Sequence, residues 1–246
     1  MTLRSERGAA LAVTLMAMLL LSAVGAALVL ATSTDVQIAV NAGAATEAFY
    51  AADAVFERTV AELGSVADFT SVLDGSVGSA FMDGPPGGVR TLPDHSTIDL
   101  LATQNLANCA KRNPCSDAEM QSSIRDRPWG RRNPRWRLFS WGMLERSGPG
   151  PPLYVVALLA DDPSEIDDDP WRDGTRTTAQ VNPGAGVLLV RGEAFGRRNA
   201  HRVVEGTVVR RDLVALARWQ AADPATRGPA PSGFPVLQVL AWREVR

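Results

Sequence analysis

The sequence is short of the side chains that most catalytic and metal-binding sites need. Its 246 residues include two histidines, His95 and His201, and two cysteines, Cys109 and Cys115. This inventory excludes a zinc site with four cysteine ligands and a scaffold of several disulfides. No nucleotide-binding, zinc-protease or serine-hydrolase motif is present, and two histidines leave little for a nucleophile triad. We therefore expect no enzyme activity, no catalytic residues and no bound cofactor.

A strong excess of either charge is also absent. Lysine and arginine number 25 against 27 aspartates and glutamates, which gives a formal net charge of −2. Such a balance creates no overall field that would attract nucleic acid or an anionic membrane surface. The length suffices for one anchor and one domain with its own apolar core. Any partner must therefore be selected by local features of the chain.

Charge is missing altogether from Ala9 to Ala31, a run of 23 residues made mainly of alanine, leucine, valine and methionine. As a helix this run would be about 34 Å long, which is enough to cross the hydrocarbon core of a bilayer. Arg4 and Arg7 precede the run, and Asp35 is the first charge after it. The positive-inside rule then predicts a cytoplasmic N-terminus and places the remainder outside. We expect residues 9–31 to form a transmembrane segment.

A secretory signal peptide would show the same order of charges. Val29 and Ala31 fit the small-residue rule for a cut after Ala31. The apolar run is longer than the core of about 7–15 residues that such peptides carry. From Asp35 to Leu63 the chain has no proline and one glycine, Gly43, so the helical pattern continues past the possible cut. We favour a span that is not cleaved at this end.

The segment after the apolar run has the pattern of an amphipathic helix. Its apolar residues recur at spacings of three and four, as Ala45, Phe49, Ala52, Phe56, Val60 and Leu63. Gly64 comes next as a helix-ending residue. Residues 32–64 are therefore predicted to continue the membrane helix, giving one helix of roughly 80 Å. Its apolar stripe requires another part of the chain to cover it.

Residues 65–246 have the pattern of a globular α+β domain. Residues 65–98 predict mainly loop with one short strand, residues 98–108 a helix, and residues 212–234 an excursion that is helical at first. Alternation predicts strands at about 135–144, 153–160, 186–195, 201–211 and 235–244. The third and fourth of these form a hairpin through Gly196-Arg197-Arg198-Asn199. An antiparallel β-sheet packed on the stripe of the long helix gives an α+β layer arrangement.

The two cysteines are six positions apart. Cys109 and Cys115 bracket the turn-forming sequence Ala-Lys-Arg-Asn-Pro, which can bring their sulfurs together. In an oxidising compartment outside the membrane a disulfide is the natural interpretation. The alternative is two unpaired, partly buried thiols.

An acidic stretch is the one candidate cation site. It comprises Asp161, Asp162, Glu165, Asp167, Asp168, Asp169 and Asp173. Its oxygens could suit calcium, but the spacing departs from the EF-hand pattern because Trp171 and Arg172 occupy the fifth and sixth positions. We favour a solvated acidic loop across residues 161–173, with no metal, and keep calcium as the alternative.

A basic patch lies over residues 125–137. It contains Arg125, Arg127, Arg131, Arg132, Arg135 and Arg137, interleaved with Trp129 and Trp136. Aromatic rings beside arginines can hold single-stranded nucleic acid. Arginine lying on tryptophan is more often structural, and the acidic loop is an available partner within the molecule or on a neighbouring subunit. Because no recognised binding motif accompanies the patch, nucleic acid is the less favoured partner.

The order of these features resembles the type IV pilins and the pseudopilins of type II secretion. The segment Glu6-Arg7-Gly8-Ala9-Ala10-Leu11-Ala12-Val13 is similar to the start of PilX-type minor pilins. The segment Glu47-Ala48-Phe49-Tyr50-Ala51-Ala52-Asp53-Ala54 resembles the stretch after the membrane helix in the same group. These motifs cover about the first quarter of the chain, and the remainder matches only in general layout.

The resemblance implies a leader peptide, residues 1–8, that a prepilin peptidase removes between Gly8 and Ala9 on the cytoplasmic face. The new Ala9 amine would then be methylated. It also implies a pilin-like fold, a single pass through the bacterial inner membrane and a periplasmic domain that reaches the cell surface within a filament. The implied partners are other pilin subunits, bound through the N-terminal helix, and the inner-membrane assembly platform.

One position departs from the pattern of the major pilins. Most of them have glutamate as the fifth mature residue, and Val13 stands there in this chain. This favours a minor pilin that assists filament initiation at or near the tip, although valine is also an ordinary residue of membrane helices. A minor pseudopilin of a type II secretion system, or a single-span envelope protein that binds a ligand, are the alternative functions.

Overall fold

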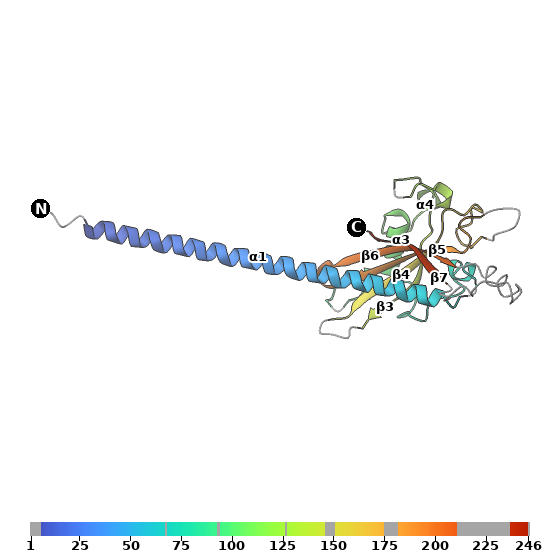
Figure 1. Ribbon diagram of the computed structural model, residues 1–246, viewed down its shortest axis with the longest axis horizontal. Helices are drawn as coiled ribbons and strands as arrows, with labels where there is room; N and C mark the ends of the chain where they lie inside the picture. The colour runs from blue at the N-terminus through green and yellow to red at the C-terminus, as the bar shows by residue number, and fades with distance from the viewer. Residues whose placement is uncertain are drawn as a thin grey trace, which may run out of the picture. The chain divides into compact units, whose positions relative to one another are not determined.

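The computed structural model describes residues 6–66, 68–92, 94–125, 127–145, 151–174, 182–210 and 237–245. The chain divides into two compact units, Met1–Ala44 and Ala45–Arg246. Figure 1 shows one long helix that begins near the N-terminus, and a sheet formed by later segments of the chain. The first unit contains the start of this helix, and the second contains its last turns together with the sheet.

The long helix is α1, Glu6–Leu63, as the sequence predicts. Among the described residues it is the one helix that is long and apolar enough to cross a membrane. Several hydroxyl side chains in its apolar part bond to carbonyls of the preceding turn: Thr14 donates to Leu11 O, and Thr32 donates to Leu28 O. An apolar helix can therefore carry these polar residues without leaving their hydroxyl groups unsatisfied. The helix ends where Gly64 N donates to Val60 O at 3.2 Å.

The second unit is built on one antiparallel sheet of five strands. In chain order they are β3 Arg137–Leu144, β4 Leu153–Asp161, β5 Val187–Phe195, β6 His201–Arg210 and β7 Leu237–Val245. Their order in the sheet is also β3-β4-β5-β6-β7. All five predicted strands are confirmed, each within two residues of its predicted bounds. The predicted β5–β6 hairpin is present, with the 3-10 turn η2, Arg197–Asn199, at its tip. The excursion predicted over 212–234 lies outside the described residues.

Smaller elements surround the sheet. They are α2 Thr70–Leu73, β1 Val89–Thr91, β2 Thr97–Asp99, α3 Leu100–Cys109, α4 Asp117–Met120 and the 3-10 turn η1 Gly130–Arg132. The helix predicted over 98–108 begins two residues later, because residues 97–99 pair with β1. Asp99 caps this helix by accepting hydrogen bonds from Leu101 N and Ala102 N. The loop predicted over 65–98 contains a short helix and two strands instead of one strand.

Each face of the sheet carries its own apolar core. On one face the last turns of α1 pack on Val155, Val190 and Val204, which places Phe56 at full burial. On the other face Leu100 and Trp141 belong to a second cluster. Because both faces are covered, β4 is buried along its whole length.

The stripe predicted on the long helix is only partly right. Ala52, Phe56 and Leu63 are buried as expected, but Phe49 and Val60 are half-buried at the margin. Ala45 is also half-buried. The centre of the buried line is shared with residues outside the predicted stripe: Ala48, Ala51, Val55 and Thr59. Small side chains occupy that line because the sheet approaches the helix closely there.

Candidate functional site

The first part of α1 has apolar side chains on every side. Leu11, Leu20 and Leu30 are each at least 64% exposed within this chain, and Val13 is 65% exposed. A helix that is apolar all round needs an apolar environment that the rest of this chain does not supply in the described residues. A bilayer or a bundle of similar helices would supply it.

The residues of the predicted leader junction lie near the start of this helix. The helix α1 begins at Glu6, so Gly8 and Ala9 are both in its first turn. The cleavage between them stays a prediction. Val13 lies one turn further along the same helix, among exposed apolar residues.

The motif at 47–54 has a clear structural role in the second unit. Ala48, Ala51 and Ala52 are buried against the sheet, where β5 and β6 present glycines. A Cβ placed on Gly192 would lie 2.5 Å from Ala52 O, and one on Gly206 would lie 2.5 Å from Phe56 Cζ. Alanines on the helix and glycines on the strands therefore allow a close helix–sheet contact.

Aromatic and charged residues border this contact. Phe49 makes edge-to-face contacts with Tyr50 and with Trp242 of β7, at centroid distances of 5.5 and 5.8 Å. Glu47 Oε2 lies 3.6 Å from Arg197 Nη2 in the β5–β6 turn. The motif thus connects α1 to β7 and to the β5–β6 turn.

Cys109 and Cys115 are joined by a disulfide in the structure, as the sequence predicts, with Sγ–Sγ at 2.02 Å and Cα–Cα at 6.0 Å. Cys109 is the last residue of α3, and Ala110 comes next in the left-handed region with φ 58°. Cys115 then precedes Ser116, which caps α4 with a reciprocal capping box to Glu119. The bridge therefore closes the turn between two short helices.

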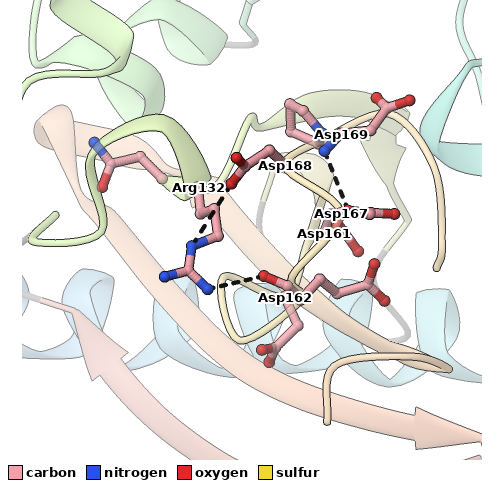
Figure 2. A pocket seen from close by; sticks show the side chains of 9 residues that line it. Arg132, Asp161, Asp162, Asp167, Asp168 and Asp169 are labelled. Atoms are coloured by element: carbon pink, nitrogen blue, oxygen red, sulfur yellow. Dashed lines mark hydrogen bonds and ion pairs between the residues drawn. The ribbon is translucent and has the colours of Figure 1, made fainter. Parts of the chain in front are cut away.

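The acidic stretch lies at the end of β4 and in the loop after it. Figure 2 shows Asp161 and Asp167 next to each other, with Arg132 turned toward Asp168. Ligand oxygens of Asp161, Glu165 and Asp167 all lie within 4.8 Å of one another. The favoured interpretation of a wholly solvated loop is wrong for two members, because Asp161 is 6% exposed and Glu165 is 2% exposed. Asp162, Asp167, Asp168 and Asp169 remain partly or fully exposed.

Burial changes the acidity of these carboxyl groups. It raises the pKa of Asp161 to about 9, and the nearby charge of Glu165 adds to this effect. Burial likewise raises the pKa of Glu165 to about 7, with Asp167 and Asp173 also opposing its ionisation. These groups are costly to ionise unless a cation or a proton accompanies them.

The basic patch does not form one continuous surface. Arg127 Nη2 donates to Met120 O and Pro134 O, and Arg137 Nη1 donates to Leu73 O. Arg135 is buried, and Trp136 is buried in the second core. These side chains are thus held within the fold, and the buried Trp136 is not accessible for stacking on a base. That nucleic acid is the less favoured partner stays a prediction.

One arginine of this patch does contact the acidic loop. Arg132 Nη1 donates to the backbone oxygen of Glu165 at 3.1 Å, and its Nε lies 3.9 Å from Asp168 Oδ1. The predicted contact between the patch and the acidic loop is therefore present at Arg132. The sequence did not identify Asn182, which lies beside Glu165 and is 4% exposed. No motif surrounds Asn182, so no sequence signal would have pointed to it.

Comparison with known proteins gives one match. Residues 7–57 match the family described as PilX N-terminal. No curated protein and no solved structure matches the chain. The matched segment runs from the exposed apolar part of α1 to the motif that packs on the sheet, so it includes both segments that resemble the PilX-type minor pilins. The long N-terminal helix and the antiparallel sheet form the α+β arrangement that the PilX N-terminal match and the resemblance to type IV pilins lead one to expect.

Proposed function

We propose that this protein is a minor pilin-like subunit of a type IV pilus that assists filament initiation. The observation that carries the proposal is the change of environment along α1. Its first part has apolar side chains exposed on every side, and its last turns are packed into the sheet. Such a helix can hold a folded domain outside a bilayer and can later join a bundle of similar helices.

The chain would then have four functional regions. Residues 1–8 are the leader, residues 9–31 span the membrane, residues 32–64 continue the helix, and residues 65–246 form the periplasmic domain. A prepilin peptidase would cut between Gly8 and Ala9, and the Ala9 amine would be methylated. The inner-membrane assembly platform and other pilin subunits are the partners, and the latter bind through the N-terminal helix.

Val13 supports a position at or near the tip. In shaft-building pilins, the glutamate at this position is thought to meet the terminal amine of the subunit already in place, inside an apolar bundle. A carboxylate buried there without its partner is costly. The first subunit has no predecessor, so valine removes that cost and also makes the subunit poor at adding behind others.

Mass spectrometry of the mature protein tests membership of the pilin class. We expect an N-terminus at methylated Ala9 in wild type and in the control Gly25→Ala, since nothing lies within 4 Å of a Cβ at Gly25. The variant Gly8→Val should retain the leader. An intact Met1, or a start at Thr32, in the wild-type protein would contradict the proposal and favour a single-span envelope protein or a cleaved signal peptide.

Subunit counting in purified filaments tests the position. We expect few tagged copies per filament, at or near one end, and more copies along the shaft for Val13→Glu than for the control Val13→Leu. Wild-type copies along the whole shaft, in numbers near those of the major subunit, would refute the tip position. Wild-type copies in the filaments of a secretion system, and not in pili, would identify a minor pseudopilin.

A further inference from the structure

The hollow at the end of β4 has a set of oxygens with no partner. Asp161 Oδ1 and Glu165 Oε1 are each buried and accept no hydrogen bond from any described residue. Both side chains are at least nine-tenths buried. A buried polar atom without a partner costs free energy, and two of them in one place point to a ligand that the protein itself does not supply.

The negative charge at this place is also not balanced from within. Within the described part of the chain, no ion pair involves Asp161, Glu165 or Asp167. Arg132 lines the hollow, but its guanidinium contacts Asp168 and a backbone oxygen. The backbone N–H of Gly174 satisfies only the other carboxylate oxygen of Glu165, at 2.8 Å.

The space between these groups is small. The hollow has a volume of about 10 Å³, close to the room that one water needs. Asp161, Glu165 and Asp167 all line it. Carboxylates from the end of β4 and from the loop after it therefore converge there, and the hollow suits one small ion.

We propose that Asp161, Glu165 and Asp167 bind one calcium ion at the end of β4. Calcium takes carboxylate oxygens at about 2.3–2.6 Å, so two oxygens on one ion can lie up to about 5 Å apart. The 4.8 Å limit of this carboxylate set satisfies that condition. Magnesium retains several waters and binds through one or two carboxylates, which fits a set of three carboxylates less well.

The ion would join the end of β4 to the loop that follows it. Asp161 is the last residue of β4, and Glu165 and Asp167 lie in that loop. Asp173 donates its backbone N–H to Thr70 Oγ1 of α2, and Gly186 N donates to Asp173 Oδ1 at 2.6 Å. Calcium would thus fix the start of the loop that contacts α2 through Asp173. This inference is independent of the filament assignment.

Calcium binding is tested on the full chain purified in detergent micelles and stripped with EGTA. Calcium chloride is added in a calorimetric titration and in thermal unfolding, with magnesium chloride as a parallel series. We expect calcium, and not magnesium at equal concentration, to raise the unfolding temperature. The affinity should fall within the range of about 10⁻⁴–10⁻³ M that is typical of extracellular calcium modules.

Two variants of equal charge change sharpen the test. Asp161→Asn should weaken calcium binding by about tenfold or more, because it removes a buried charged ligand. It should also raise the unfolding temperature in EGTA, because it removes a buried carboxylate that lacks a partner. The matched control is Asp168→Asn, since Asp168 is exposed and its φ of 58° is one that asparagine tolerates. This control should bind calcium like the wild type.

Three results would overturn the proposal. If calcium produces neither heat of binding nor a thermal shift in the wild type, the buried carboxyl groups share a proton instead of a metal ion. If magnesium stabilises the protein as well as calcium does, the assignment of the ion is wrong. If Asp168→Asn loses binding as fully as Asp161→Asn, the calcium lies in the exposed loop and not in the buried hollow.

Discussion

The two ends of α1 have opposite surroundings. Both are rich in alanine and carry large apolar residues, but residues 9–31 carry no charge, whereas the second part carries several charged residues. In the first unit Leu19, Leu20 and Leu21 are exposed within this chain, whereas in the second unit Val55, Phe56 and Leu63 are fully buried. The difference lies in the distribution of the apolar residues around the helix, because only the second part has polar residues on one side.

One continuous helix can therefore lie in two different environments along its length. Where apolar residues surround the axis, nothing on the helix directs it toward a particular partner, and an apolar environment must come from a bilayer or from other helices. Where they form one face, the sheet covers that face through its glycines at 192 and 206. A change in either part should therefore affect one environment and leave the other intact.

The largest expected effect is in the buried part. Phe56→Ala removes a fully buried ring that lies against Gly206, and the close contact of helix and sheet gives the site little freedom to collapse. We expect a loss of about 3–5 kcal/mol in the free energy of unfolding, measured by urea titration of the full chain in micelles. The fraction of protein in the membrane should not change.

The control for this variant lies one position along the helix. Glu57 is exposed, so Glu57→Ala should change the free energy of unfolding by no more than about 0.5 kcal/mol. Equal losses of stability in the two variants would mean that the buried and exposed faces of this part of α1 contribute equally. The contrast between the two parts of the helix would then be wrong.

A smaller effect is expected from a charge in the exposed part. Leu20→Lys places an ammonium group near the middle of the predicted span, at a cost to membrane insertion of about 3 kcal/mol. The protein should move from the carbonate-resistant membrane fraction to the soluble fraction, while Leu20→Ala stays in the membrane. Urea unfolding of the second unit should be the same in all three proteins. A loss of stability in Leu20→Lys would show that the two parts of α1 are energetically coupled.

The sequence predicted the elements whose apolar residues recur with a regular period. It missed the features that depend on how closely two elements approach or how deeply a residue is buried. The helix α1 and the five strands are predictable from periodicity, which records which side of an element is apolar. The same periodicity does not show how closely Gly192 and Gly206 let the helix approach, so the predicted stripe misplaced its own centre. The second short strand was missed because three residues are too few for a pattern.

The acidic hollow was harder to predict for a related reason. A run of aspartates is usually solvated, so composition alone predicts an exposed loop. Asp161 is buried instead because β4, which it ends, is covered on both faces. One signal was available: the unbroken apolar run from Leu153 to Ala160 is typical of a strand buried on both faces, and Asp161 comes directly after it. Asn182 comes to lie beside Glu165 only through the three-dimensional path of the chain.

The smallest expected effect concerns the sheet face that points away from α1. Because side chains alternate along a strand, Gly192 faces the helix while Arg191 and Glu193 lie on the opposite side. Arg191 Nε lies 2.6 Å from Glu193 Oε1, and His201 Nε2 lies 2.8 Å from Glu193 Oε2. Arg191 also contacts Glu205 Oε1 at 2.5 Å. A row of charges thus crosses β5 and β6 on this face, whereas the face toward α1 carries an apolar core.

The acidity of Glu193 reflects this row. Burial alone would raise the pKa of Glu193, but the hydrogen bond with His201 and the charge of Arg191 outweigh it and lower the pKa below its ordinary value of 4.5. A carboxyl group whose pKa is lower in the folded state stabilises the protein above its unfolded pKa. That contribution is lost as the pH falls through the lower, folded value. The wild type should therefore lose stability when the pH is taken below about 4.5.

The variant Glu193→Gln isolates this contribution. At pH 7 it removes the charged partner of Arg191 and His201 but leaves Glu205 in place, so we expect a loss of about 2 kcal/mol in the free energy of unfolding. Between pH 5 and the acid range its stability should fall less steeply than that of the wild type, in parallel urea titrations. Arg243→Gln is the matched control, because Arg243 is 73% exposed and its pair with Glu205 should be worth less than about 1 kcal/mol. If Glu193→Gln keeps the full acid-induced loss of the wild type, the pH dependence arises elsewhere, and the two faces of the sheet do not differ in the way this comparison requires.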